Sequence, residues 1–144
     1  MIADIDRRND MTLKDKNFLT PQLPLSESGE LEYKHVDNYA ALVRQNLKNL
    51  ILTIPGERTM DSDFGVGIQM YLFGNNASAA SSEIASAISR KTSKYLPFVD
   101  MQNVLVEPGE IQSSLTVRIF YSVPSLAIQE NMNLTFTEDG KLIS

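Results

Sequence analysis

The spacing of apolar residues changes once along this chain, and that change limits the folds it can adopt. From about residue 36 to about residue 95, apolar side chains recur every three or four residues, which is the repeat of a helix with one buried face. From about residue 99 they recur every second residue, as in strands with one buried face. A group of helices followed by a group of strands predicts an α+β fold.

The first helix is predicted from about residue 36 or 37 to Thr53. Asp37 is its expected N-cap, because an aspartate side chain can accept a hydrogen bond from the free N–H groups of the first turn. Pro55-Gly56 ends the helix. The buried face is predicted to carry the apolar residues Val36, Tyr39, Ala40, Val43, Leu47, Leu50, Ile51 and Ile54.

A glycine-containing loop and a second helix follow. A short helical turn is expected over 68–73, and the second helix is expected from about residue 77 or 78 to Tyr95, with Pro97 after its end. Its predicted buried residues are Ala80, Ile84, Ala87, Ile88 and Tyr95. Its predicted exposed residues are Ser86, Ser89, Arg90, Lys91 and Lys94.

Three neighbouring strands are predicted in the last third. The first covers about 99–106, with an irregularity around Gln102-Asn103, and Pro108-Gly109 then turns the chain. The second covers 115–123, and the third covers 126–136, where Glu130 interrupts the apolar alternation. Short turns between them predict an antiparallel meander of three strands, or slightly more. Two helices must then cover its apolar face.

The first 35 residues differ from the rest. Pro21, Pro24 and Gly29 interrupt regular structure repeatedly, although apolar residues stand between them. We therefore predict an extended N-terminal arm over 1–35, part of which lies on a protein surface. Residues 36–144 are predicted to form one α+β domain, which is an ordinary size for a single core.

Composition restricts the chemistry that the chain can perform. The chain has no cysteine, which excludes disulfides and thiolate metal sites. It has a single histidine, His35, which excludes most other metal sites and catalytic triads. A net charge of −5 argues against a protein that neutralises nucleic-acid phosphates. No membrane span or signal peptide is visible, so we expect folding in a cytoplasm. We expect no catalytic residue, cofactor, metal, nucleic acid or membrane contact, and a protein partner instead.

The segment 46–74, NLKNLILTIPGERTMDSDFGVGIQMYLFG, resembles the small baseplate wedge family of contractile-tailed phages. This lysozyme-like, GPW-type family includes the type VI secretion component TssE. The matching motifs are Pro55-Gly56-Glu57-Arg58, Asp61-Ser62-Asp63-Phe64-Gly65 and Leu72-Phe73. The order of elements extends the resemblance over roughly 18–137.

One position departs from the family pattern. Family members often carry Glu-Pro-Arg at the end of the second helix, where it helps seat the protein on the wedge core. The matching segment here is Leu96-Pro97-Phe98, so only the proline is kept. The resemblance implies a partner-binding surface made of Glu57, Arg58, Asp61, Asp63, Phe64, Leu96, Pro97 and Phe98.

The resemblance also implies a function. It predicts a structural, non-enzymatic subunit of a virion tail baseplate or a related contractile injection system, present in several copies around a sixfold axis. Its implied partners are baseplate wedge proteins and the tail sheath protein, with a tail tube initiator as a further candidate. Because the family fold resembles part of the sheath protein, the subunit is expected to template the first sheath ring by sharing strands. The candidate docking edges are 126–137 and the N-terminal arm.

The alternative reading is a peptidoglycan-cleaving, lysozyme-like glycosidase using Glu57 with Asp61 or Asp63. A glycosidase needs two carboxyl groups flanking the bond, one of them with a raised pKa in an apolar pocket. These acids stand in a glycine-rich loop beside Arg58, which lowers carboxyl pKa values. We therefore predict that Glu57 and either Asp61 or Asp63 cap short elements and pair with Arg58, and we favour the structural reading.

Overall fold

The computed structural model describes residues 20–23, 35–36, 38–72, 77–110, 114–137, 139 and 141–143. The chain divides into two compact units, residues 1–46 and 47–144. Helix α2, Tyr39–Leu52, begins in the first unit and ends in the second. The sequence-based division into an arm over 1–35 and a domain over 36–144 stays a prediction.

The first unit contains a short strand pair and the start of α2. Strand β1, Thr20–Pro21, pairs antiparallel with β2, His35–Val36. The Leu23 N–H donates to Gln45 Oε1 (2.9 Å), and Gln45 Nε2 donates to the Pro21 carbonyl (3.0 Å). Two residues of the predicted arm are thereby hydrogen-bonded to the side chain of a helix residue.

Helix α2 begins at Tyr39 and is capped by Asn38. The Asn38 Oδ1 atom accepts a hydrogen bond from the Ala41 N–H at 2.9 Å, which satisfies one of the free donors of the first turn. Asp37, the N-cap predicted from the sequence, lies outside the described residues. The predicted end of the helix near Thr53 is confirmed to within one residue.

The second unit carries the other two helices where the sequence predicted them. Helix α3 covers Ile68–Leu72, and helix α4 covers Ala77–Tyr95. The end of α4 is followed by a turn in which the Val99 N–H donates to the Leu96 carbonyl at 2.9 Å. This turn leads directly into the first strand of the sheet.

The sheet is the predicted antiparallel meander. Its strands are β3 (Asp100–Pro108), β4 (Ser114–Val123) and β5 (Ile128–Thr137), in the order β3-β4-β5. The register shifts between Met101 and Asn103, so the irregularity predicted at Gln102-Asn103 is confirmed as a β-bulge. The third strand begins later than predicted, because Pro124–Leu126 form a 3-10 helix, η1.

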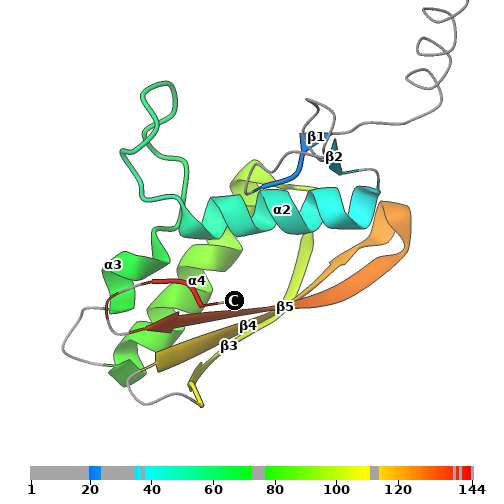
Figure 1. The fold of residues 1–144 in the computed structure, drawn as a ribbon. Coiled ribbons are helices and arrows are strands. Elements are labelled where there is room, and N and C mark those ends of the chain that lie inside the picture. The colour runs from blue at the N-terminus through cyan, green and yellow to red at the C-terminus, as the bar shows by residue number, and fades with distance from the viewer. Residues whose placement is uncertain are drawn as a thin grey trace, which may run out of the picture. The chain divides into compact units, whose positions relative to one another are not determined.

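The core lies on one face of this sheet. In Figure 1, α4 runs along that face, beside the sheet. The strands bury the inward residues Val117, Ile119, Tyr121, Val123, Met132, Leu134 and Phe136. The helical segments of the same unit bury Leu47, Leu50, Ile51, Ile68, Ile84, Ala87 and Ile88. The α+β fold class, with helices packed on a three-stranded antiparallel sheet, is therefore confirmed.

The structure explains why Glu130 interrupts the apolar alternation of β5. Tyr121 is fully buried, and its hydroxyl donates a hydrogen bond to Glu130 Oε2 at 3.0 Å. A buried phenol needs a hydrogen-bond partner, and Glu130 stands opposite Tyr121 in the strand register. The break in the pattern marks the place where the core contains a polar group.

The two edges of the sheet differ. At the β5 edge, residues 141–143 pair with the end of the strand, because the Thr137 N–H donates to the Lys141 carbonyl (2.9 Å) and the Ile143 N–H to the Thr135 carbonyl (2.8 Å). Strand β3 forms the other edge, and α4 packs beside it. These edges matter because the outer side of an edge strand presents backbone donors and acceptors that another strand can use.

Candidate docking surface

The loop between α2 and α3 is held tightly at its base. The Val66 N–H donates to the Leu50 carbonyl at 2.9 Å, which ties the returning chain to the end of α2. Gly65 has a φ of 108°, and a Cβ atom built there would stand 2.1 Å from the Thr53 carbonyl oxygen. Only glycine permits this close approach of two backbone segments.

Residues 55–64 form what we call the projecting loop, which stands away from the helices in Figure 1. Its two sides are joined because the Gly56 N–H donates to the Ser62 carbonyl at 2.7 Å. Glu57 Oε2 accepts from the Ile54 N–H at 3.1 Å. Residues 55–63 are exposed, and Met60 is 100% exposed. The loop therefore presents an ordered set of side chains to solvent.

Asp63 joins the projecting loop to α4. Its carboxylate accepts from Lys91 Nζ at 2.7 Å and from Lys94 Nζ at 2.6 Å, and its carbonyl oxygen also accepts from Lys91. Hydrogen bonds from Lys91 and then Lys94 hold the Asp63 pKa well below its ordinary value. The predicted pairing of Glu57 and either Asp61 or Asp63 with Arg58 is therefore wrong, because the two lysines bind Asp63 and, among the described residues, no ion pair includes Arg58. The predicted exposure of Lys91 is also wrong, since its side chain is only 12% exposed.

Aromatic contacts strengthen the same junction. The rings of Phe64 and Tyr95 meet edge to face with their centroids 5.0 Å apart. The Arg58 guanidinium carbon lies 3.7 Å from the centroid of the Phe64 ring. The Tyr95 hydroxyl donates to Asp61 Oδ1 (3.1 Å) and Asp63 Oδ2 (3.2 Å). Desolvation, followed by the hydrogen bond to Asp61, raises the Tyr95 pKa.

The structure brings the two predicted parts of the partner-binding surface close together. Glu57, Arg58, Asp61 and Asp63 are exposed on the projecting loop, and Phe64 is half-buried at its base. Phe64 contacts Tyr95, the residue directly before Leu96-Pro97-Phe98. Leu96 is half-buried, and Phe98 is 46% exposed. A partner-binding role for these eight residues stays a prediction.

Sequence reasoning did not assign Lys91, Lys94 and Tyr95 to this surface. Lys94 and Tyr95 stand three and four residues after Lys91, so one face of the last turns of α4 supplies all three contacts with Asp63. The signal in the sequence was a loop with more acids than bases and a helix end with two lysines. Only the fold shows that these two segments meet.

The carboxylates of the loop do not have the environment of a glycosidase. A general acid needs a raised pKa, whereas the pKa of Asp63 is lowered. Glu57, Asp61 and Asp63 are all exposed, and each accepts a hydrogen bond from within the protein. These hydrogen bonds fix the shape of the projecting loop.

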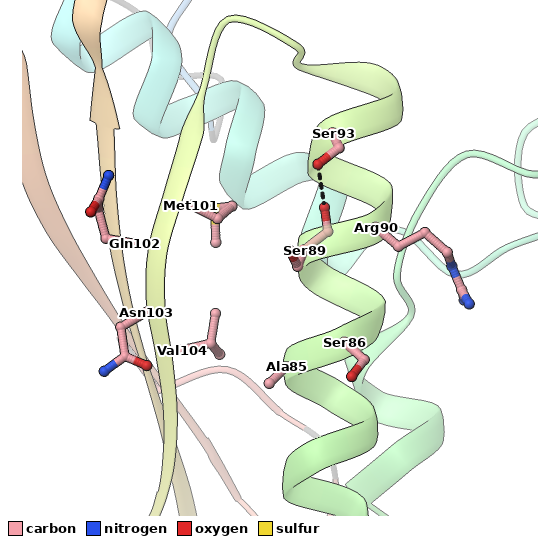
Figure 2. Close-up of a pocket in the computed structure, with 9 residues that line it drawn as sticks. All are labelled: Ala85, Ser86, Ser89, Arg90, Ser93, Met101, Gln102, Asn103 and Val104. Atoms are coloured by element: carbon pink, nitrogen blue, oxygen red, sulfur yellow. Dashed lines mark hydrogen bonds between the residues drawn. The ribbon is translucent and has the colours of Figure 1, made fainter.

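A groove lies between α4 and the edge strand β3. Its volume is about 560 Å³, and it is lined by Ala85, Ser86, Ser89, Arg90, Ser93 and residues 101–104. Figure 2 shows Met101, Val104 and Ala85 directed into the space between the helix and the strand, and Arg90 directed away from it. The groove has small side chains on its helix wall and a strand edge as its other wall.

Replacing Asp63 with asparagine is expected to change how stability depends on pH. A lowered carboxyl pKa stabilises the folded state fully above the unfolded value of about 4, and this contribution is lost as the pH falls below it. Asp63→Asn should therefore be less stable than wild type at pH 7, and the difference should shrink in acid. Thermal midpoints measured from pH 7 to pH 2 test this.

The matched control for that experiment is Asp139→Asn, which removes an exposed carboxylate after the last strand. Its difference from wild type should stay small across the same pH range. A constant difference between Asp63→Asn and wild type from pH 7 to pH 2 would contradict the assigned ion pairs.

Two further features bear on the kind of site. In the described part of the chain, no helix is long and apolar enough to cross a membrane. Among the described residues, no group of three or more histidine, cysteine, aspartate or glutamate side chains is placed to hold a metal ion.

Comparisons with known structures support the fold. A crystal structure of a candidate tail lysozyme from Geobacter sulfurreducens aligns with a TM-score of 0.64 and 22% identity, over 72% of this chain and 95% of that chain. A baseplate subunit of the anti-feeding prophage, from a sixfold-symmetrised cryo-EM structure, aligns with a TM-score of 0.62 and 24% identity, over 70% of this chain and 81% of that chain. No curated protein sequence matches this chain.

The sequence itself identifies the family. The family described as "Baseplate wedge protein gp25" matches residues 37–125, which is more than half of the 144-residue chain. The match includes the projecting loop, α4, and strands β3 and β4. The chain therefore belongs to the gp25 family of baseplate wedge proteins and is a structural subunit of the baseplate of a contractile, phage-like tail.

Proposed function

We propose that this subunit docks on the baseplate wedge core and receives a strand of the tail sheath protein at the groove beside β3. The observation that carries this proposal is the groove itself, since an edge strand forms one wall of it. An added strand satisfies the free backbone groups of an edge, and the space beside that edge selects its side chains.

The dimensions of the groove favour an extended segment with small or medium side chains. Its helix wall carries Ser86, Ser89 and Ser93, whose short side chains leave room beside the strand. The half-buried Met101 and Val104 supply apolar contacts. The β5 edge is a weaker candidate, because residues 141–143 already pair with one end of it.

Docking on the wedge core would use the projecting loop and the segment that follows α4. This surface is already ordered by Asp63, Phe64 and Tyr95, so little conformational entropy is lost when a partner binds. We infer that the subunit acts by binding and not as an enzyme, is assembled in the cytoplasm of the host, and occurs in several copies around the tail axis. A tail tube initiator is a further candidate partner.

The test is co-expression with the sheath protein and the wedge proteins encoded beside this one. Wild type should be recovered with both. Ser86→Trp fills the groove and should lose the sheath protein while keeping the wedge proteins. Glu83→Trp is the matched control, because Glu83 is exposed on the same helix and does not line the groove. A wild-type monomer that binds neither partner would refute the proposed function.

A further inference from the structure

The charged side chains of the projecting loop differ in whether they have a hydrogen-bond or ion-pair partner within the protein. Glu57 accepts from the Ile54 N–H, Asp61 from the Tyr95 hydroxyl, and Asp63 from two lysines. The Arg58 guanidinium contacts the Phe64 ring, and within the described residues it donates no hydrogen bond and joins no ion pair. Among the charged groups that the structure describes in this loop, the one left without a polar partner is therefore a cation.

The contact with Phe64 also orients this cation. A guanidinium is planar and carries its five N–H donors around its edge. With its carbon atom 3.7 Å from the ring centroid, Arg58 rests against Phe64, which itself packs edge to face on Tyr95. Phe64 and Tyr95 thus support the guanidinium while its donors remain available to a partner at the exposed surface of the loop.

We propose that Arg58 is a preorganised receptor for a carboxylate side chain of a wedge protein, bound through two parallel N–H···O hydrogen bonds. The proposal rests on the proposed docking to the wedge core and names the chemistry of that contact. Paired hydrogen bonds from a guanidinium to a carboxylate are among the strongest polar contacts in protein interfaces. Holding the guanidinium in place before binding lowers the entropic cost of forming them.

The surroundings of Arg58 favour a protein carboxylate over the phosphates of a nucleic acid. Glu57 and Asp61 are exposed on the same loop, and the chain carries a net charge of −5, which repels a long polyanion. Met60, two residues away, is fully exposed and is suited to pack on an apolar surface. The partner surface should therefore present an acidic side chain beside an apolar patch.

The decisive variant is Arg58→Lys, which keeps the charge but removes the planar pair of donors and the contact of the guanidinium with Phe64. We expect it to weaken affinity for the purified wedge proteins by about tenfold or more. Arg44→Lys is the control, because Arg44 is exposed on α2 and is the same type of residue. That change should alter affinity by less than about twofold.

Three further measurements show whether the change at Arg58 acts on the wedge contact alone. The thermal midpoint of Arg58→Lys should match wild type, since the side chain is exposed, and recovery of the sheath protein should not change. In the wedge protein, reversing the contacted acidic residue to lysine should weaken binding of wild type, and Arg58→Glu should restore binding to that variant.

Several outcomes would overturn the inference. If Arg58→Lys binds the wedge proteins within about twofold of wild type, the carboxylate receptor is refuted while the docking function stands. Binding of duplex DNA that is lost in Arg58→Lys would assign the guanidinium to phosphates instead. A wild-type protein that binds neither wedge nor sheath protein would refute the proposed function and this inference together.

Discussion

Gly65→Ala is expected to lower the free energy of unfolding by about 3 kcal/mol or more, one of the larger effects for a single methyl group. The added Cβ would lie 2.1 Å from the carbonyl oxygen and 2.8 Å from the carbonyl carbon of Thr53. Both atoms belong to the backbone at the end of α2, so neither can rotate away. The residue would also have to keep a φ of 108°, which alanine rarely adopts.

Gly56→Ala separates the conformational cost of a positive φ from the steric cost of the contact with Thr53. Gly56 has a similar φ of 93°, but a Cβ atom there meets nothing within 4 Å. Its cost should therefore be the conformational one alone, about 1–2 kcal/mol. Urea unfolding of both variants would measure the two free energies. If both variants lose the same free energy of unfolding, the close contact between Gly65 and Thr53 adds no cost at position 65.

Phe136→Ala is expected to cost about 3–5 kcal/mol of stability, because it leaves a cavity the size of a phenyl ring in the core. Phe136 is fully buried on the inner face of β5, and its backbone pairs with Leu142. Small relaxations of the sheet cannot fill that space, since the preceding inward positions on β5, Leu134 and Met132, are already packed.

Phe98→Ala is the matched substitution at the surface. Phe98 is 46% exposed in the turn after α4, so its loss should change stability by less than about 1 kcal/mol. Chemical denaturation of both variants tests the difference. A large loss of stability in Phe98→Ala would mean that this residue supports the core, and its predicted role in partner binding would then have to be reconsidered.

The regular elements could be predicted from the sequence because each depends on neighbouring residues. The alternation of Leu115, Val117 and Ile119 requires one buried strand face, and the structure buries Val117 and Ile119 completely. Even the bulge near Gln102 could be predicted, since the alternation shifts by one residue there. Any fold that buries one face of a sheet requires this alternation, so the alternation can be read from the sequence without knowing the rest of the fold.

The contacts of the projecting loop could not be predicted in the same way. Asp63 and Lys91 are 28 residues apart, and the choice among Arg58, Lys91 and Lys94 as partners depends on how α4 passes the loop. The helical repeat also predicted an exposed Lys91, although Asp63 covers its ammonium group. Proximity in the sequence favoured Arg58 as the partner, while Phe64 occupies that side chain instead.

The bulge in β3 has a consequence for the protein before it reaches an assembly. An edge that can receive a foreign strand can also pair with the same edge of another copy, which begins aggregation. The register shift between Met101 and Asn103 bends and twists β3 at one end, so two identical edges cannot align along their full length. The same irregularity therefore disfavours edge-to-edge pairing between copies of this subunit.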